Sequence, residues 1–75
     1  MSKLPILSGK EIIRALSKIG YHKSRQRGSH IRLECEGRRS ITVPNYKTID
    51  RSLLRKILRD AELSINEFIK LLKDL

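Results

Sequence analysis

The stretch Gln26-Arg27-Gly28-Ser29-His30-Ile31-Arg32-Leu33 decides how the middle of this chain folds. The small, flexible Gly28 marks the point where one short strand turns into the next. After this turn apolar residues alternate with polar ones, namely Ile31, Leu33 and Cys35 with His30, Arg32 and Glu34. Successive side chains of a strand point to opposite faces of a sheet, so the pattern predicts a strand over residues 29–35 with His30 facing away from the core.

Two further strands flank this one. Residues 21–26 are mostly polar, and the Arg27-Gly28 turn that follows them favours an edge strand there. Glu36-Gly37-Arg38 is typical of a hairpin turn, and the strand after it ends at Pro44, because proline has no N–H to donate to a sheet. In this third strand the expected inward residues are Ile41 and Val43, and the outward ones are Ser40 and Thr42.

The residues before the first strand predict a helix over about residues 9–19. Ser8 and Glu11 have the spacing of a capping box, and Leu7 and Ile12 have the spacing of a hydrophobic staple. Gly20 follows the last apolar residue and suits a left-handed C-terminal cap. The apolar face of this helix consists of Ile12, Ile13, Leu16 and Ile19.

Two more helices are predicted after the third strand. The first is capped by Thr48 or Asp50, and the second begins with another capping box, Ser64 and Glu67. Their apolar stripes are Leu53, Leu54, Ile57, Leu58 and Ala61 in one, and Ile65, Phe68, Ile69, Leu72 and Leu75 in the other. On another face of the first, Arg51, Arg55 and Arg59 recur every fourth residue, either as a solvated ridge or as a grip on a nucleic-acid backbone.

The predicted fold class is therefore α+β, in the order α-β-β-β-α-α. Residues 1–75 are expected to form one domain, with a three-stranded antiparallel sheet and helices on one of its faces. The other face is left open. It is expected to carry His30, Arg32, Ser40 and Thr42, which makes it a polar and basic docking surface.

The charge of the chain is high and uneven. Seventeen Lys and Arg against eight Asp and Glu give a formal net charge of +9. Residues 21–59 carry eleven of the basic and three of the acidic side chains, so the excess lies in the middle of the chain. Such a field suits a polyanion, because each neutralised phosphate releases counterions. An acidic protein partner fits the same field.

Several classes of protein are not indicated. A single cysteine, Cys35, allows no internal disulfide, and with two histidines it does not have the spacing of a metal site, so no metal and no cofactor are expected. Cys35 is read as a small core residue. The sequence has no apolar run long enough for a membrane span and no signal-peptide stretch, so we expect no membrane partner and a cytoplasmic location.

Residues in and around the Gly28 turn offer the groups that metal-independent RNA cleavage needs, namely a base, an acid and positive charge. The unperturbed pKa of a histidine, about 6.5, lets His30 act as a general acid or base near neutral pH. Positive charge for the phosphorane comes from Arg25, Arg27, Arg32 or Lys47, and Ser29 is placed to orient the phosphate. The alternative is a surface histidine that only hydrogen-bonds a phosphate. His22 is read as an ordinary exposed residue.

The chain also resembles a known family. It contains, in this order, the motifs Ser8-Gly9-Lys10-Glu11, Gly20-Tyr21, Arg25-Gln26-Arg27-Gly28-Ser29-His30, Val43-Pro44, Leu54-Arg55-Lys56-Ile57-Leu58-Arg59-Asp60-Ala61 and Leu63-Ser64. Together they resemble the HicA toxins from about Leu7 to about Leu72. After Val43-Pro44 many members carry a histidine, whereas this chain has Asn45-Tyr46-Lys47, where Tyr46 can stack on a base.

This resemblance implies a fold similar to double-stranded-RNA-binding domains. It implies an mRNA interferase of a type II toxin–antitoxin module, with His30 of the Gly-Ser-His motif as the catalytic residue. The expected partners are mRNA and a HicB-type antitoxin that covers the active surface. The residues expected to bind RNA are Arg25, Arg27, Gly28, Ser29, Arg32 and Lys47. Two other readings stay open, a non-catalytic RNA-binding module and a subunit that meets an acidic protein.

Overall fold

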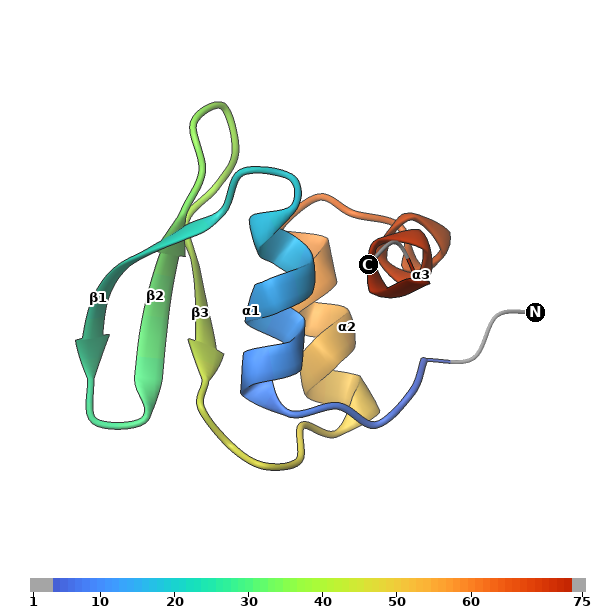
Figure 1. Ribbon diagram of the computed structural model, residues 1–75, viewed down its shortest axis with the longest axis horizontal. Coiled ribbons are helices and arrows are strands. Elements are labelled where there is room, and N and C mark those ends of the chain that lie inside the picture. The colour runs from blue at the N-terminus through green and yellow to red at the C-terminus, as the bar shows by residue number, and fades with distance from the viewer. Residues whose placement is uncertain (1–3, 74–75) are drawn as a thin grey trace.

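A computed structural model describes residues 4–73, which fold into three helices and three strands (Figure 1). The elements are α1 (Gly9–Ser17), β1 (His22–Arg27), β2 (His30–Glu34), β3 (Ile41–Pro44), α2 (Arg51–Asp60) and α3 (Ile65–Lys73). The predicted α+β class and element order are confirmed. The strand bounds differ slightly, since β1 begins and ends one residue later than predicted and β2 is one residue shorter at each end.

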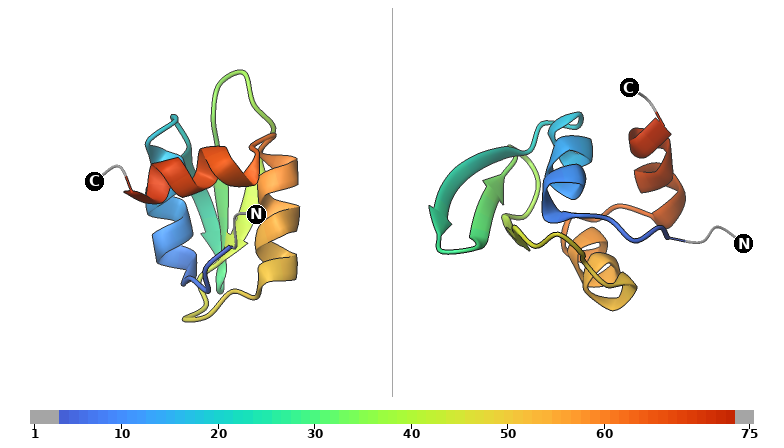
Figure 2. Two further views of the ribbon diagram at one scale, coloured as in Figure 1. Left: turned by 90° about the vertical axis from the view of Figure 1, so that its right-hand side faces the viewer. Right: turned by 60° about the horizontal axis from the view of Figure 1, so that its bottom comes forward.

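The three strands form one antiparallel sheet in the order β1-β2-β3. All three helices lie on the same side of it, with α1 and α2 nearer the sheet and α3 crossing them on the far side (Figures 1 and 2). The predicted inward strand residues are buried and face the helices; they are Ile31, Leu33, Ile41 and Val43. Cys35 is half-buried against this core. None of the described helices is long and apolar enough to cross a membrane.

Local capping interactions begin each helix. In α1 the Ser8 N–H donates to Glu11 Oε1 at 2.9 Å, and the Glu11 N–H donates to Ser8 Oγ at 3.1 Å. The same reciprocal pair joins Ser64 and Glu67 in front of α3. The Leu53 N–H donates to Asp50 Oδ1 at 2.7 Å, so Asp50 rather than Thr48 caps α2. Both predicted capping boxes are therefore confirmed. Leu75, assigned to the apolar stripe of the last helix, lies outside the described residues.

The chain leaves α1 and α2 in the same way but with different residues. After α1, the Gly20 N–H donates to Ser17 O and the Tyr21 N–H to Leu16 O, with Gly20 at a φ of +111°. After α2 the paired bonds run from Glu62 to Arg59 O and from Leu63 to Leu58 O. Both are Schellman motifs, which require a left-handed residue. Glycine fills that position after α1, as predicted, whereas Glu62 fills it after α2 with a φ of +60°.

Candidate functional site

The turn between β1 and β2 consists of two residues, Gly28 and Ser29. Gly28 has a φ of +58° and Ser29 does not have a positive φ, which is the pattern of a type II′ hairpin turn with glycine first. Arg27 and His30 close the turn as directly opposite residues. The Gln26 side-chain amide also donates to Gly28 O at 2.9 Å. The predicted turn is confirmed, and Arg27 belongs to the strand rather than to the turn itself.

A β-bulge in β1 decides which of its side chains share a face with His30. Arg25 lies opposite Arg32, but Lys23 lies opposite Leu33, so Ser24 is an extra residue between two pairs. Directly opposite residues of an antiparallel pair point to the same face. Arg25 therefore lies on the open face, whereas Lys23, two residues earlier, lies on the helix face. In a regular strand, residues two positions apart point to the same face, so Lys23 and Arg25 could not face opposite ways without the bulge.

Tyr21, just before β1, explains why the bulge is needed. Its side chain is buried against the helices, and its hydroxyl donates to Arg39 O at 2.8 Å. Burial raises the pKa of this phenol, and the nearby Cys35 raises it further. In a regular strand, residues 21, 25 and 27 would all point to the same face. Tyr21 faces the core, however, whereas Arg25 and Arg27 face away from it. The bulge at Ser24 reconciles the two requirements.

A shallow hollow of about 130 Å³ lies on the open face. It is lined by Arg25, Arg27, His30, Arg32 and Thr42. All five side chains are exposed. Four of them are predicted site residues, which β1 and β2 bring together, and Thr42 comes from β3. Thr42 was predicted to point outward but not to belong to the site; its place opposite Arg32 on β3 follows from the alternation of that strand.

The other predicted site residues do not line this hollow. Gly28 and Ser29 form the turn at one end of it, next to His30. Lys47 is exposed in the loop between β3 and α2 and does not line the hollow. Ser40 is exposed, as predicted, but it precedes β3 and lines an adjoining groove between that strand and α2, which shares Arg32 and Thr42 with the hollow. The hollow therefore depends on arginines of the hairpin and not on the loop lysine.

The second histidine of the chain also lies on the open face, but at the other end of the hairpin. His22 pairs with Glu34, four residues along β2 from His30. At about 3.3 Å per residue the two histidines are separated by roughly 13 Å along the strand. His22 is exposed and does not line the hollow, so His30 is the histidine placed among the arginines.

The loop after β3 is held close to the turn and to the start of α1. The Asn45 N–H donates to Ser29 O at 2.6 Å, and the Gly9 N–H donates to Tyr46 O at 2.9 Å. A β-carbon on Gly9 would lie only 2.1 Å from Pro44 O, so only glycine permits this approach of helix and loop. These contacts fix the position of the loop relative to His30.

The arginine ridge of α2 does not act as one unit. The Arg51 Nε donates to Leu4 O at 2.6 Å and so fastens the N-terminal segment to the helix. Arg55 and Arg59 are exposed. Arg51 thus makes a structural contact. The exposed Arg55 and Arg59 fit either of the two predictions for the ridge, a solvated helix face or a contact to a nucleic-acid backbone.

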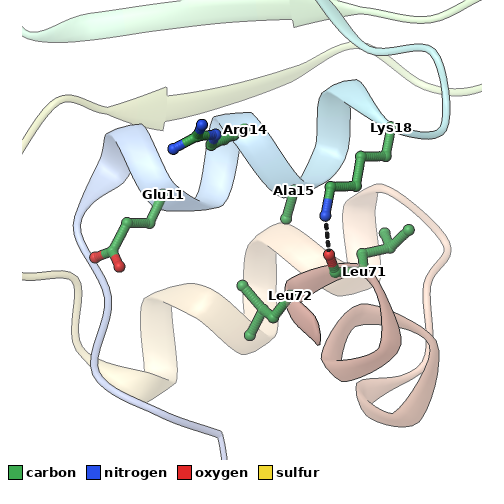
Figure 3. A pocket seen from close by; sticks show the side chains of 6 residues that line it. All are labelled: Glu11, Arg14, Ala15, Lys18, Leu71 and Leu72. Atoms are coloured by element: carbon green, nitrogen blue, oxygen red, sulfur yellow. Dashed lines mark hydrogen bonds between the residues drawn. The ribbon is translucent and has the colours of Figure 1, made fainter. Parts of the chain in front are cut away.

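Another hollow lies between α1 and α3 (Figure 3). It is lined by Glu11, Arg14, Ala15, Lys18, Leu71 and Leu72. In it the Lys18 ammonium donates to Leu71 O at 2.5 Å, which ties the end of α1 to α3. None of the predicted site residues lines this hollow. Over residues 4–73, no three His, Cys, Asp or Glu side chains gather into a group that could hold a metal ion.

Comparison with known proteins assigns the chain to a family. A sequence model described as the HicA toxin of bacterial toxin-antitoxin systems matches residues 9–63, which include the sheet, α1 and α2 but not α3. The solved structure "Toxin-Antitoxin complex from Streptococcus pneumoniae" contains a similar chain, with 33% sequence identity and a TM-score of 0.68. The similarity covers 76% of this chain and 98% of that one. The comparison with curated proteins gave no match. The chain described here belongs to the HicA toxin family.

Proposed function

We propose that this protein is the toxin of a type II toxin–antitoxin pair and acts as a metal-independent endoribonuclease on mRNA, with His30 as its general acid and base. One observation carries the proposal: His30 lies in the same hollow as Arg25, Arg27 and Arg32. An imidazole can move a proton near neutral pH, and the guanidinium groups can bind the phosphate on which it acts. The membership in the HicA toxin family supports the same reading.

The reaction that fits this arrangement is transesterification within the RNA strand. The His30 imidazole accepts the proton of a ribose 2′-hydroxyl, and the 2′-oxygen forms a bond to the adjacent phosphorus. The bond from phosphorus to the 5′-oxygen breaks, and that oxygen takes the proton back from the imidazolium. The products are a 2′,3′-cyclic phosphate and a 5′-hydroxyl end. Arg25, Arg27 and Arg32 offset the charge that develops on the phosphorane.

A HicB-like antitoxin is the proposed protein partner. The similar chain of known structure comes from a toxin-antitoxin complex, which supports a partner of this kind. An antitoxin that covers the hairpin would block the arginine hollow and so exclude RNA. Because mRNA is the proposed substrate, we place the activity in the cytoplasm.

An RNA digest in excess chelator tests the proposal. The parent protein, His30→Ala and the matched control His22→Ala are incubated with one mRNA, and the product ends are mapped. The parent and His22→Ala should cut and leave cyclic or 3′-phosphate ends. His30→Ala should lose about 10²–10⁴-fold in rate, the usual contribution of a positioned proton-transfer group.

The other outcomes decide between the readings. Equal cutting by the parent and His30→Ala would assign the activity to another residue or to a contaminant. RNA binding by all three proteins without cutting would establish the non-catalytic RNA-binding module instead. Loss of the folded circular-dichroism spectrum in His30→Ala would show that the histidine is structural. Cutting by the parent that occurs only in a parallel digest without chelator would contradict metal independence.

A further inference from the structure

Tyr46 is a large aromatic side chain that the fold leaves exposed in the loop after β3. Its side chain is 47% exposed, although most other large apolar side chains of residues 4–73 are packed in the core. About half of its surface is therefore accessible to a ligand, in a loop whose backbone is bonded to Ser29 of the turn beside His30.

The backbone on both sides of Tyr46 is firmly held. The Asn45 N–H bonds to Ser29 O, and Tyr46 O accepts the Gly9 N–H. Three residues later, the Ile49 N–H donates to Leu7 O at 2.7 Å. The loop is thus attached to the catalytic hairpin on one side and to the segment before α1 on the other. The backbone that carries the ring is thus already in position before a ligand arrives, which reduces the entropy lost on binding.

The position of Tyr46 relative to His30 follows from the sheet register. His30 lies directly opposite Pro44, and Tyr46 is two residues beyond Pro44. The α-carbon spacing of a cross-strand pair, added to the length of two extended residues, puts the α-carbons of His30 and Tyr46 within about 13 Å of each other. A base that contacts Tyr46 would then belong to a nucleotide close to the phosphate in the arginine hollow.

We propose that Tyr46 is a stacking platform for an unpaired RNA base next to the bond that His30 cleaves, so that the substrate is single-stranded at the cleavage site. The inference rests on the proposed function. An arginine-lined hollow for the backbone beside an aromatic ring for a base is the combination by which proteins bind single strands. A paired A-form helix does not offer its base faces for stacking, whereas unpaired loops do.

A stacking role predicts a specific kinetic signature. Stacking on an aromatic ring contributes about 1–3 kcal/mol per base, so Tyr46→Ala should weaken binding of single-stranded RNA by about 5–150-fold. Tyr46→Phe keeps the ring and should bind within about twofold of the parent. The loss in Tyr46→Ala should appear in KM, with kcat little changed, because the contact is made equally before and during the reaction.

The composition of the chain permits a direct measurement of stacking. It contains two tyrosines and no tryptophan, so Tyr21→Phe leaves Tyr46 as the only tyrosine fluorophore. This change is combined with His30→Ala to prevent cleavage. The double variant is titrated with a labelled single-stranded RNA and with a duplex of the same sequence. Label anisotropy reports binding, and tyrosine emission reports stacking.

We expect the single strand to quench the emission of Tyr46 in parallel with binding, and the duplex to bind without quenching. Binding of the single strand without quenching would overturn the inference, as would equal quenching by the duplex or no RNA binding at all. Ile6→Ala, which removes the other strongly exposed large apolar side chain of residues 4–73, is the control and should leave affinity unchanged. Because the fluorescence readout needs no cleavage, failure of the ribonuclease proposal alone shows separately, as quenching in the double variant together with a parent that never cuts.

Discussion

Arg25 and Arg32 lie directly opposite each other across β1 and β2, on the face that carries His30. Two like charges in this position destabilise a sheet, typically by a few tenths to about 1 kcal/mol. A polyanion bound between them would remove this repulsion. The pair therefore costs stability in the free protein and favours phosphate binding, which is a common compromise at functional surfaces.

Replacement of one member of this pair should separate the two effects. Arg25→Thr is expected to raise the free energy of unfolding by about 0.2–1 kcal/mol and to weaken RNA binding. The slope of log K against log salt for a single strand should fall in magnitude by about 0.7, the value of one lost phosphate contact. Denaturant unfolding and binding at several salt concentrations measure both quantities.

Lys23→Thr is the matched control for Arg25→Thr. Lys23 belongs to the same strand but faces the helices, and its ammonium donates to Gln26 Oε1 at 2.9 Å. Its replacement should leave the salt dependence of RNA binding nearly unchanged. An equal change of slope in both variants would mean that only net charge matters and that the face does not.

Gly9→Ala should destabilise the protein although alanine is the better helix former. The new β-carbon would lie 2.1 Å from Pro44 O, which is backbone and cannot rotate away. Overpacking of this kind costs about 1–3 kcal/mol, more than the 0.5–1 kcal/mol or so that alanine usually gains over glycine in a helix. Thermal unfolding of Gly9→Ala and of the neighbouring exposed-site control Lys10→Ala tests this, and an unchanged or higher Tm in Gly9→Ala would refute the close contact.

Glu62→Gly should stabilise the protein. Glu62 has a φ of +60°, a left-handed conformation that costs a residue with a β-carbon about 1 kcal/mol relative to glycine. For a chain of this size, 1 kcal/mol corresponds to a rise in Tm of about 4–8 °C. Glu62→Ala keeps the β-carbon and should show no such rise. A similar gain in both variants would point to the removed charge as the cause.

The buried phenol of Tyr21 should make stability depend on alkaline pH. Burial raises its pKa in the folded protein above the ordinary value of 10.0, so in this range the folded state holds a proton that the unfolded state has lost. Stability contributed by this group is complete below pH 10 and is lost as the pH rises from there through the folded pKa. Unfolding in urea between pH 8 and pH 11 (roughly the window that brackets a phenol) should show this decline.

Tyr21→Phe should show a smaller decline over the same pH range, because the titrating group is gone while the ring remains. All other titrating groups are present in both proteins, so their contributions cancel in the difference between the two pH profiles. At pH 8 the variant should be less stable, since the hydrogen bond to Arg39 O is lost. Parallel pH profiles for the two proteins would show that Tyr21 is not the source of the dependence.

Much of this structure was predictable from short stretches of sequence. The two capping boxes, Gly20 at the end of α1 and the turn at Gly28 all depend on groups within a few residues of each other. The alternation in β2 placed His30 and Arg32 on the open face, since each apolar residue in it is buried. These features are local, and local hydrogen bonds and periodicity decide them.

The face of β1 was decided only by tertiary structure. All six of its residues are exposed and none is apolar, so no alternation marked which of them would face the helices. The bulge at Ser24 arises because Tyr21 is buried at one end of the strand while the Gly28 turn sets the register at the other. The loop that carries Tyr46 and Lys47 was likewise positioned by distant backbone contacts, through Gly9 and Ser29. Such contacts join residues that are far apart in the chain, and no local pattern records them.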